Sequence, residues 1–140
     1  MKKLIAAILT IAALFATFAV PVSAAQAPEI SPLYENVVSA YVTLAIDSSG
    51  GATVRVRMTG SNSLEQVNVI TYLERQISGK WYRVYLGNLE TEWNYTTTSS
   101  TIYQTYTAQL STTGTYRAVS EFTVIGTTVE TFTKTSQCTY

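Results

Sequence analysis

From residue 37 onward, apolar and polar residues alternate with a period of two, and clusters of Gly, Ser, Asn and Thr interrupt the alternation at intervals of roughly ten residues. Successive side chains of a β-strand point to opposite faces, so this period predicts strands with one buried face. No stretch combines the helical period of about 3.6 residues with helix caps. The pattern therefore predicts an all-β domain, a single antiparallel β-sandwich of about seven strands.

The clearest alternation predicts a first hairpin. Residues 40–46 and 52–58 each place their apolar side chains on one face. The connection between them ends in Gly50-Gly51, and glycine readily adopts the positive φ that a tight turn requires.

A second hairpin is predicted around Ser78-Gly79, because a two-residue turn there pairs Ile77 with Lys80 and fixes the register along both strands. Directly opposed residues share a face. The outward face then carries the pairs Gln76–Trp81, Glu74–Arg83 and Tyr72–Tyr85, and the buried face carries Leu73–Val84.

This outward face supplies the candidate ligand-binding residues Trp81, Arg83, Tyr85 and Tyr72. Flat rings cover apolar area at a low entropy cost, so an aromatic platform edged by polar groups is typical of β-sandwiches that bind sugars or peptides. The alternative is that the face packs against residues 87–97, with the aromatic residues of that segment closing a minor cluster.

The register of the last hairpin stays open at this point. A two-residue loop after Ile125 pairs Val124 with Val129, whereas a three-residue loop pairs Phe122 with Phe132.

The segment Leu110–Ala118, with the sequence LSTTGTYRA, resembles the corner before strand F of the immunoglobulin-like superfamily. The resemblance implies a structural tyrosine corner at Gly114 and Tyr116, in which the buried tyrosine bonds to backbone of the 110–114 turn. Ala118 stands where antibody domains have a cysteine, and Thr112 replaces the usual aspartate.

Residues 37–135 are also similar to small secreted immunoglobulin-like proteins of Gram-positive bacteria. The similarity lies in the hairpin strand, the Ser-Gly-Lys-Trp turn and the later Gly-x-Tyr-Arg. It implies a fold and a compartment, not an activity.

Residues 1–24 are predicted to be a cleavable signal peptide. The sequence begins Met-Lys-Lys, continues with an uncharged apolar run over residues 4–22 and ends in Val22-Ser23-Ala24. The run is long enough to span a bilayer, but Pro21 and the lack of a basic flank favour cleavage. A mature N-terminus at Ala25 is expected, with a cut after Ala27 as the alternative.

Three segments follow from this division: the signal peptide at 1–24, a linker or leader segment at 25–36, and an immunoglobulin-like domain at 37–140. The expected location is extracellular. Cys138 is the only cysteine, so no internal disulfide can form, and its thiol is expected to lie in a frayed tail.

The chain contains no histidine, which removes the commonest general base and the commonest metal ligand. No catalytic residue, metal site or cofactor is predicted. The carboxylate pairs Glu90–Glu92 and Glu121–Glu130 leave a hydrolase as a distant alternative.

Loss of the signal peptide leaves seven basic residues against nine acidic ones, scattered along the chain. This distribution argues against binding to nucleic acid, and no membrane anchor is expected after cleavage. We expect a secreted non-enzymatic binding module whose partner is an unknown extracellular glycan or protein. The alternative is a secreted effector, an inhibitor or small antagonistic protein that acts through a loop or the free thiol.

Overall fold

The computed structural model describes residues 34–140, except residue 88. The predicted signal peptide and residues 25–33 of the predicted linker lie outside the described residues. Residues 34–36 contact the domain: the ring of Tyr34 lies 4.7 Å from that of Phe132, and the buried Asn36 donates from Nδ2 to the carbonyl of Thr128 (3.0 Å). Across residues 34–140, residue 88 aside, no helix is long and apolar enough to cross a membrane.

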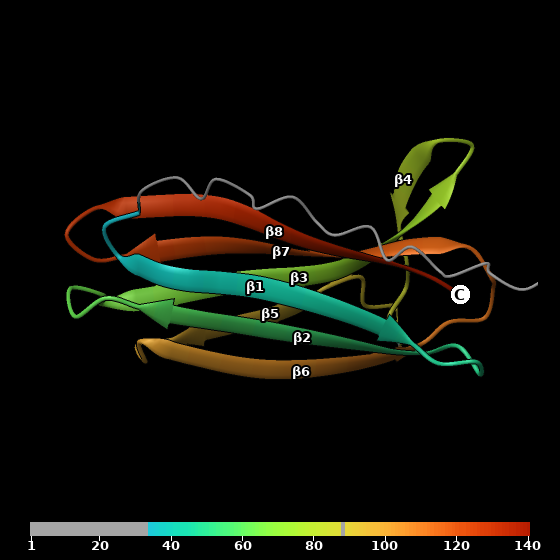
Figure 1. The fold of residues 1–140 in the computed structure, drawn as a ribbon, viewed down its shortest axis with the longest axis horizontal. Helices are drawn as coiled ribbons and strands as arrows, with labels where there is room; N and C mark the ends of the chain where they lie inside the picture. The colour runs from blue at the N-terminus through green and yellow to red at the C-terminus, as the bar shows by residue number, and fades with distance from the viewer. Residues whose placement is uncertain (1–33, 88) are drawn as a thin grey trace, which may run out of the picture. The chain divides into compact units, whose positions relative to one another are not determined.

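The described part of the chain folds into eight strands in two antiparallel sheets (Figure 1). One sheet has the order β1-β2-β6, and the other has the order β4-β3-β7-β8 with β5 also paired to β3. The strands are β1 (Val37–Ile46), β2 (Gly51–Gly60), β3 (Gln66–Ile77), β4 (Lys80–Arg83), β5 (Trp93–Thr97), β6 (Thr101–Gln109), β7 (Thr115–Ile125) and β8 (Val129–Thr139).

This strand order confirms the predicted fold class. The orders β1-β2-β6 and β3-β7-β8 correspond to the A-B-E and C-F-G strands of an immunoglobulin-like sandwich. The structure has one strand more than the expected seven, because residues 93–97 pair with β3 beside the short β4.

The predicted first hairpin is present, with Val42 opposite Val56 and Leu44 opposite Val54. These four side chains face the second sheet and are buried there, as the alternation predicts. From the other sheet, Val67, Val69, Leu73, Tyr116, Ala118, Phe122 and Val124 complete the core.

The last hairpin takes the three-residue alternative, with Phe122 opposite Phe132. The two rings stack with centroids 4.8 Å apart and an interplanar angle of 10°. In this register Val129 lies opposite Ile125 at the exposed end of the hairpin, and the ring of Phe132 packs against the core.

The tyrosine corner is confirmed. Tyr116 is buried near the start of β7, and its hydroxyl donates to the carbonyl of Thr112. Gly114 has a φ of +152°, a conformation that residues with a Cβ rarely adopt, and its N–H donates to the carbonyl of Tyr140 (3.0 Å). The corner therefore holds the 110–114 turn against the end of the chain.

Candidate ligand-binding face

The β3–β4 hairpin has the predicted register and rises away from the rest of the sheet (Figure 1). Ser78 and Gly79 have φ values of 50° and 79°, as a two-residue hairpin turn requires. The recorded pairs are Glu74–Arg83, Arg75–Tyr82, Gln76–Trp81 and Ile77–Lys80.

The predicted Tyr72–Tyr85 pair is not formed, because the ladder ends at Glu74–Arg83. The strands stay together one residue further, since the N–H of Val84 donates to the carbonyl of Leu73 (3.0 Å). Leu73 is fully buried as predicted, and Val84 is partly buried. Tyr85 leaves the strand and is 67% exposed.

Tyr72 supports Arg83. The guanidinium carbon of Arg83 lies 3.7 Å from the centroid of the Tyr72 ring, which leaves the tyrosine only 8% exposed. The Tyr72 hydroxyl donates to Oε1 of Glu121 (2.7 Å). Burial, followed by this bond to a carboxylate, raises the pKa of Tyr72. Of the four candidate residues, Tyr72 is thus the only one that is buried.

Trp81 is half-buried and carries Arg117 on its ring, with the guanidinium carbon 4.4 Å from the ring centroid. Nε of Arg117 also contacts Oε2 of Glu74 at 2.6 Å. Sequence analysis missed Arg117 because it lies on β7, far along the chain. The signal that finds it is the β3–β7 register, which places Arg117 opposite Glu74.

Arg83 is held from a second side by Glu92, whose Oε2 accepts from Nη1 at 2.8 Å. Asn94 donates to the other oxygen of Glu92 (3.2 Å). Arginine side chains and aromatic rings alternate across this surface, and each of the two arginines also contacts a carboxylate, Arg83 that of Glu92 and Arg117 that of Glu74. We call it the cation–aromatic network, made of Tyr72, Glu74, Trp81, Arg83, Glu92, Arg117 and Glu121.

Exposed apolar side chains gather on the same hairpin and on the loop after it. Among the described residues, half of the eight most exposed large apolar side chains lie between residues 77 and 89: Ile77, Tyr82, Tyr85 and Leu89. Leu89 is 85% exposed and has a φ of 67°, which is uncommon for a residue with a side chain. Its turn is closed by the N–H of Glu90, which donates to the carbonyl of Gly87 (2.8 Å).

The aromatic residues of the 87–97 segment are partly buried and pack against the sandwich core. Trp93 stacks on Tyr106 with centroids 4.8 Å apart and an angle of 6°. Tyr95 also packs against the core. This contact joins β5 to β6, so the two rings do not close the minor cluster expected as the alternative, while the outward face does contact the 87–97 segment through Arg83 and Glu92.

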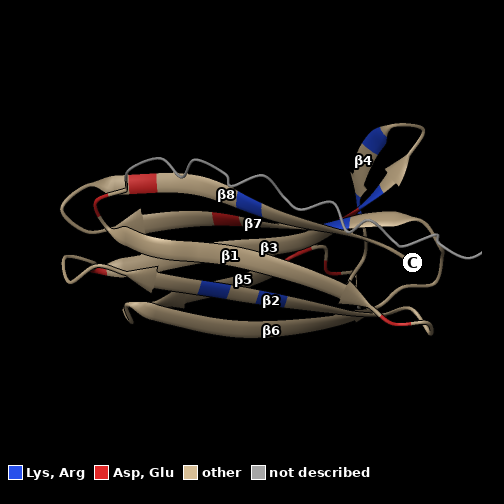
Figure 2. Ribbon diagram, viewed as in Figure 1, with Lys and Arg blue, Asp and Glu red and all other residues tan. Residues whose placement is uncertain are grey.

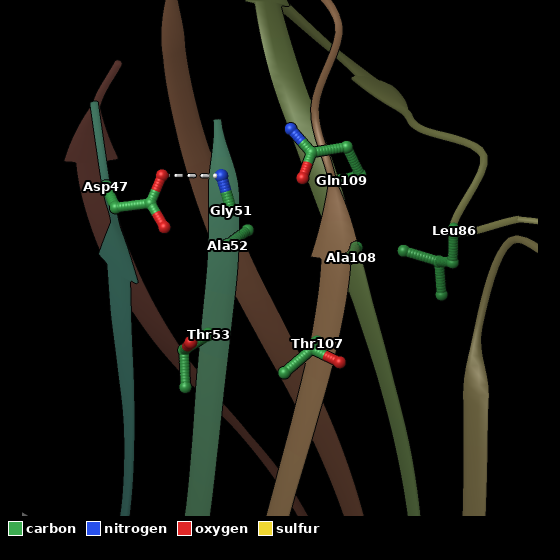
Figure 3. Close-up of a pocket in the computed structure, with 8 residues that line it drawn as sticks. All are labelled: Asp47, Gly51, Ala52, Thr53, Leu86, Thr107, Ala108 and Gln109. Atoms are coloured by element: carbon green, nitrogen blue, oxygen red, sulfur yellow. Dashed lines mark hydrogen bonds between the residues drawn. The ribbon is translucent and has the colours of Figure 1, made fainter. Parts of the chain in front are cut away.

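A shallow hollow of about 400 Å³ lies near the β1–β2 turn, between β2, β6 and Leu86 (Figure 3). Its floor is made of small side chains, including Ala52 and Ala108. Among the described residues that line it, Asp47 has the only titratable side chain, and Oδ1 accepts from the N–H of Gly51 (2.9 Å). Hydrogen bonds, first that of the Ser49 hydroxyl, lower the pKa of Asp47. The carboxylate therefore organises the turn.

Other acidic groups also have structural partners. Glu130 accepts from the backbone N–H of Glu35 (2.6 Å), while Glu92 and Glu121 belong to the network. No three His, Cys, Asp or Glu side chains of the described residues are grouped to hold a metal ion. Cys138 lies within β8 and is partly buried, so the expected placement in a frayed tail is wrong.

The sequence matches no family model and no curated protein. Among solved structures it is similar to a crystal structure of the CARDB domain of a Pyrococcus furiosus protein in complex with di-metal ions. The similarity has 15% sequence identity and a TM-score of 0.39, and it covers 75% of this chain and 97% of that chain.

Proposed function

We propose that this chain is an exported, non-enzymatic binding module that contacts a protein or peptide partner through the β3–β4 hairpin and the loop after it. The observation that carries the proposal is the concentration of exposed apolar side chains between Ile77 and Leu89. Grouped exposed apolar side chains mark interaction sites in soluble proteins. Two of these are aliphatic and offer no ring face to a sugar, which favours a protein surface over a glycan.

The cation–aromatic network supports the proposal because it fixes the side chains of Trp81 and Arg83 on the same hairpin, on the face opposite to that of Tyr82. Arg83 is held by Tyr72 and Glu92, and Trp81 is held by Arg117. Trp, Tyr and Arg dominate the energetic centres of protein interfaces. Side chains that are already ordered lose less entropy on binding.

A secreted effector that acts through a loop is the second candidate. It is favoured by Leu89, an exposed leucine held at positive φ in a tight turn, because strained backbone often accompanies a functional loop. The partly buried Cys138 favours the loop over the thiol as the acting element.

The test is selection of a random-peptide phage library on the exported protein, followed by affinity measurements on single variants. We expect Trp81→Ala, Tyr85→Ala and Leu89→Ala to weaken the selected peptides by roughly thirtyfold at the strongest position. The control is Thr133→Ala, which changes an exposed side chain of β8 outside the hairpin and should bind normally. Normal binding by all three hairpin variants would contradict the proposal. If the wild type instead binds a glycan and the same three variants lose that binding, the ligand of the hairpin is a sugar and not a peptide.

Export has its own test. Mass spectrometry of protein from the culture medium should show loss of residues 1–24 and a new N-terminus at Ala25. Recovery of the chain with Met1 in the membrane fraction would show a retained anchor instead.

A further inference from the structure

The outer face of the β1-β2-β6 sheet carries two arginines among tyrosine and threonine side chains. Its central row places Tyr41, Arg57 and Tyr103 opposite one another across the three strands, and the next row places Arg55 between two threonines. Tyr41 is 49% exposed and Tyr103 is 63% exposed. The full face consists of Ser39, Tyr41, Thr43, Ala45, Thr53, Arg55, Arg57, Thr59, Thr101, Tyr103, Thr105, Thr107 and Gln109.

The two arginines of this face have no acidic residue on the strands that form it, and the carboxylate of Asp47 lies at one end of the face, where it lines a hollow with Thr53 and Thr107. The sequence of β2 contains Arg55 and Arg57, and the strand is coloured blue at its basic residues in Figure 2, whereas the sequences of β1, β2 and β6 contain no Asp or Glu. Neither Arg55 nor Arg57 forms an ion pair with any residue that the structure describes. The arginines of the cation–aromatic network, by contrast, each contact a carboxylate. The two faces of the molecule therefore differ in whether their arginines are paired.

The rows also place aromatic rings beside the charges. The guanidinium carbon of Arg57 lies 4.5 Å from the ring centroid of Tyr103. Tyr41 lies on the other side of Arg57, and neighbouring strands are about 4.8 Å apart, so the two tyrosines flank the cation at about 10 Å from each other. Arg55 follows about 7 Å along the same strand.

We infer that this face is a second binding site, for an extended acidic polysaccharide that carries carboxylate groups. The two guanidiniums take carboxylates, which they match in planar geometry. The flanking tyrosine rings take the apolar faces of sugar rings, and the threonine hydroxyls donate to and accept from sugar hydroxyls. The site is distinct from the hairpin and does not depend on the function proposed for it.

Two other polyanions fit less well. Nucleic acid and anionic membranes are bound by dense clusters of basic residues, whereas this face has two basic residues in all, Arg55 and Arg57. A row of hydroxyls and rings around two charges matches a ligand in which charges are spaced by neutral, hydroxyl-rich units.

The experiment is calorimetric titration of the exported protein with oligogalacturonate, and with the same oligosaccharide after methyl esterification of its carboxyl groups. We expect binding of the free acid that weakens as salt is added, since exposed charges are screened, and little binding of the ester. Arg57→Gln and Tyr103→Ala should each weaken binding by about fivefold or more, and Arg55→Gln by about threefold.

Lys80→Gln is the matched control, because it removes one exposed positive charge from the hairpin and leaves this face intact. It should bind the free acid as the wild type does, as should Trp81→Ala. Thermal unfolding of each variant separates lost binding from lost fold. The inference is overturned if the free acid does not bind at low salt, if Lys80→Gln loses as much affinity as Arg57→Gln, or if single-stranded DNA or anionic vesicles bind this face as tightly.

Discussion

The guanidinium of Arg117 covers the ring of Trp81 even though their strands, β7 and β4, lie on opposite sides of β3. The contact crosses β3 at Glu74, which is opposite Arg83 on one side and Arg117 on the other. Nε of Arg117 reaches the Glu74 carboxylate at 2.6 Å. One carboxylate on β3 thus connects the projecting hairpin to the body of the sheet.

This arrangement predicts a measurable coupling between Glu74 and Arg117. Glu74→Gln and Arg117→Gln should each destabilise the protein, because each leaves a partly buried charge without its partner. A double-mutant cycle by urea unfolding should give a coupling free energy of about 1 kcal/mol, reduced from that of a buried pair by partial exposure. Additivity within about 0.3 kcal/mol would show that the contact is not energetically significant.

The tyrosine corner gives a second prediction. Tyr116→Phe removes the hydrogen bond that the buried tyrosine donates to the carbonyl of Thr112, an exposed residue, and should lower the free energy of unfolding by about 1 kcal/mol. The same chemical change at the exposed Tyr103 is the control and should be close to neutral. If the two variants unfold at the same urea concentration, the hydrogen bond of the tyrosine corner does not contribute measurably to stability.

The last hairpin gives a third prediction. Phe132→Ala removes the ring that stacks on Phe122 and should cost about 2–3 kcal/mol. Val129→Ala, at the exposed end of the same strand, should change stability by no more than about 0.5 kcal/mol. A larger effect at Val129 would mean that the hairpin in solution has the other register.

Local turn chemistry explains which parts of the fold the sequence predicts. Ser78-Gly79 admits only one short loop, so the β3–β4 register follows from the turn. After Ile125, by contrast, loops of two and three residues are both compatible with the residues present, and the choice depends on the Phe122–Phe132 contact in the folded core. Alternation then predicts burial along most of each strand, and it fails where both faces are covered, at residues 71–73 of β3 and 118–120 of β7.

The candidate sites show the same division. The sequence places Trp81 and Arg83 on one face because both lie in a single hairpin. It does not reveal that Arg117 covers Trp81, or that Tyr103 lies beside Arg57, because these contacts join strands far apart in the chain. Only the assembled sheets bring such residues together.

The last prediction concerns stability at alkaline pH. Burial raises the pKa of Tyr72, Tyr106 and Tyr116 in the folded protein. Because the unfolded chain then loses these protons first, the stabilisation they give is complete below the unfolded pKa of about 10 and is lost as pH rises through the higher folded values. The free energy of unfolding should therefore fall with pH above about 10.

Tyr116→Phe isolates one of these groups. The variant lacks one phenol that must ionise, so its free energy of unfolding should fall less steeply with alkaline pH than that of the wild type. The measurement is urea unfolding at a series of alkaline pH values, with phenolate absorbance recorded in parallel. Identical slopes for Tyr116→Phe and the wild type would mean that Tyr116 ionises alike in the folded and unfolded chains, which contradicts its burial at the corner.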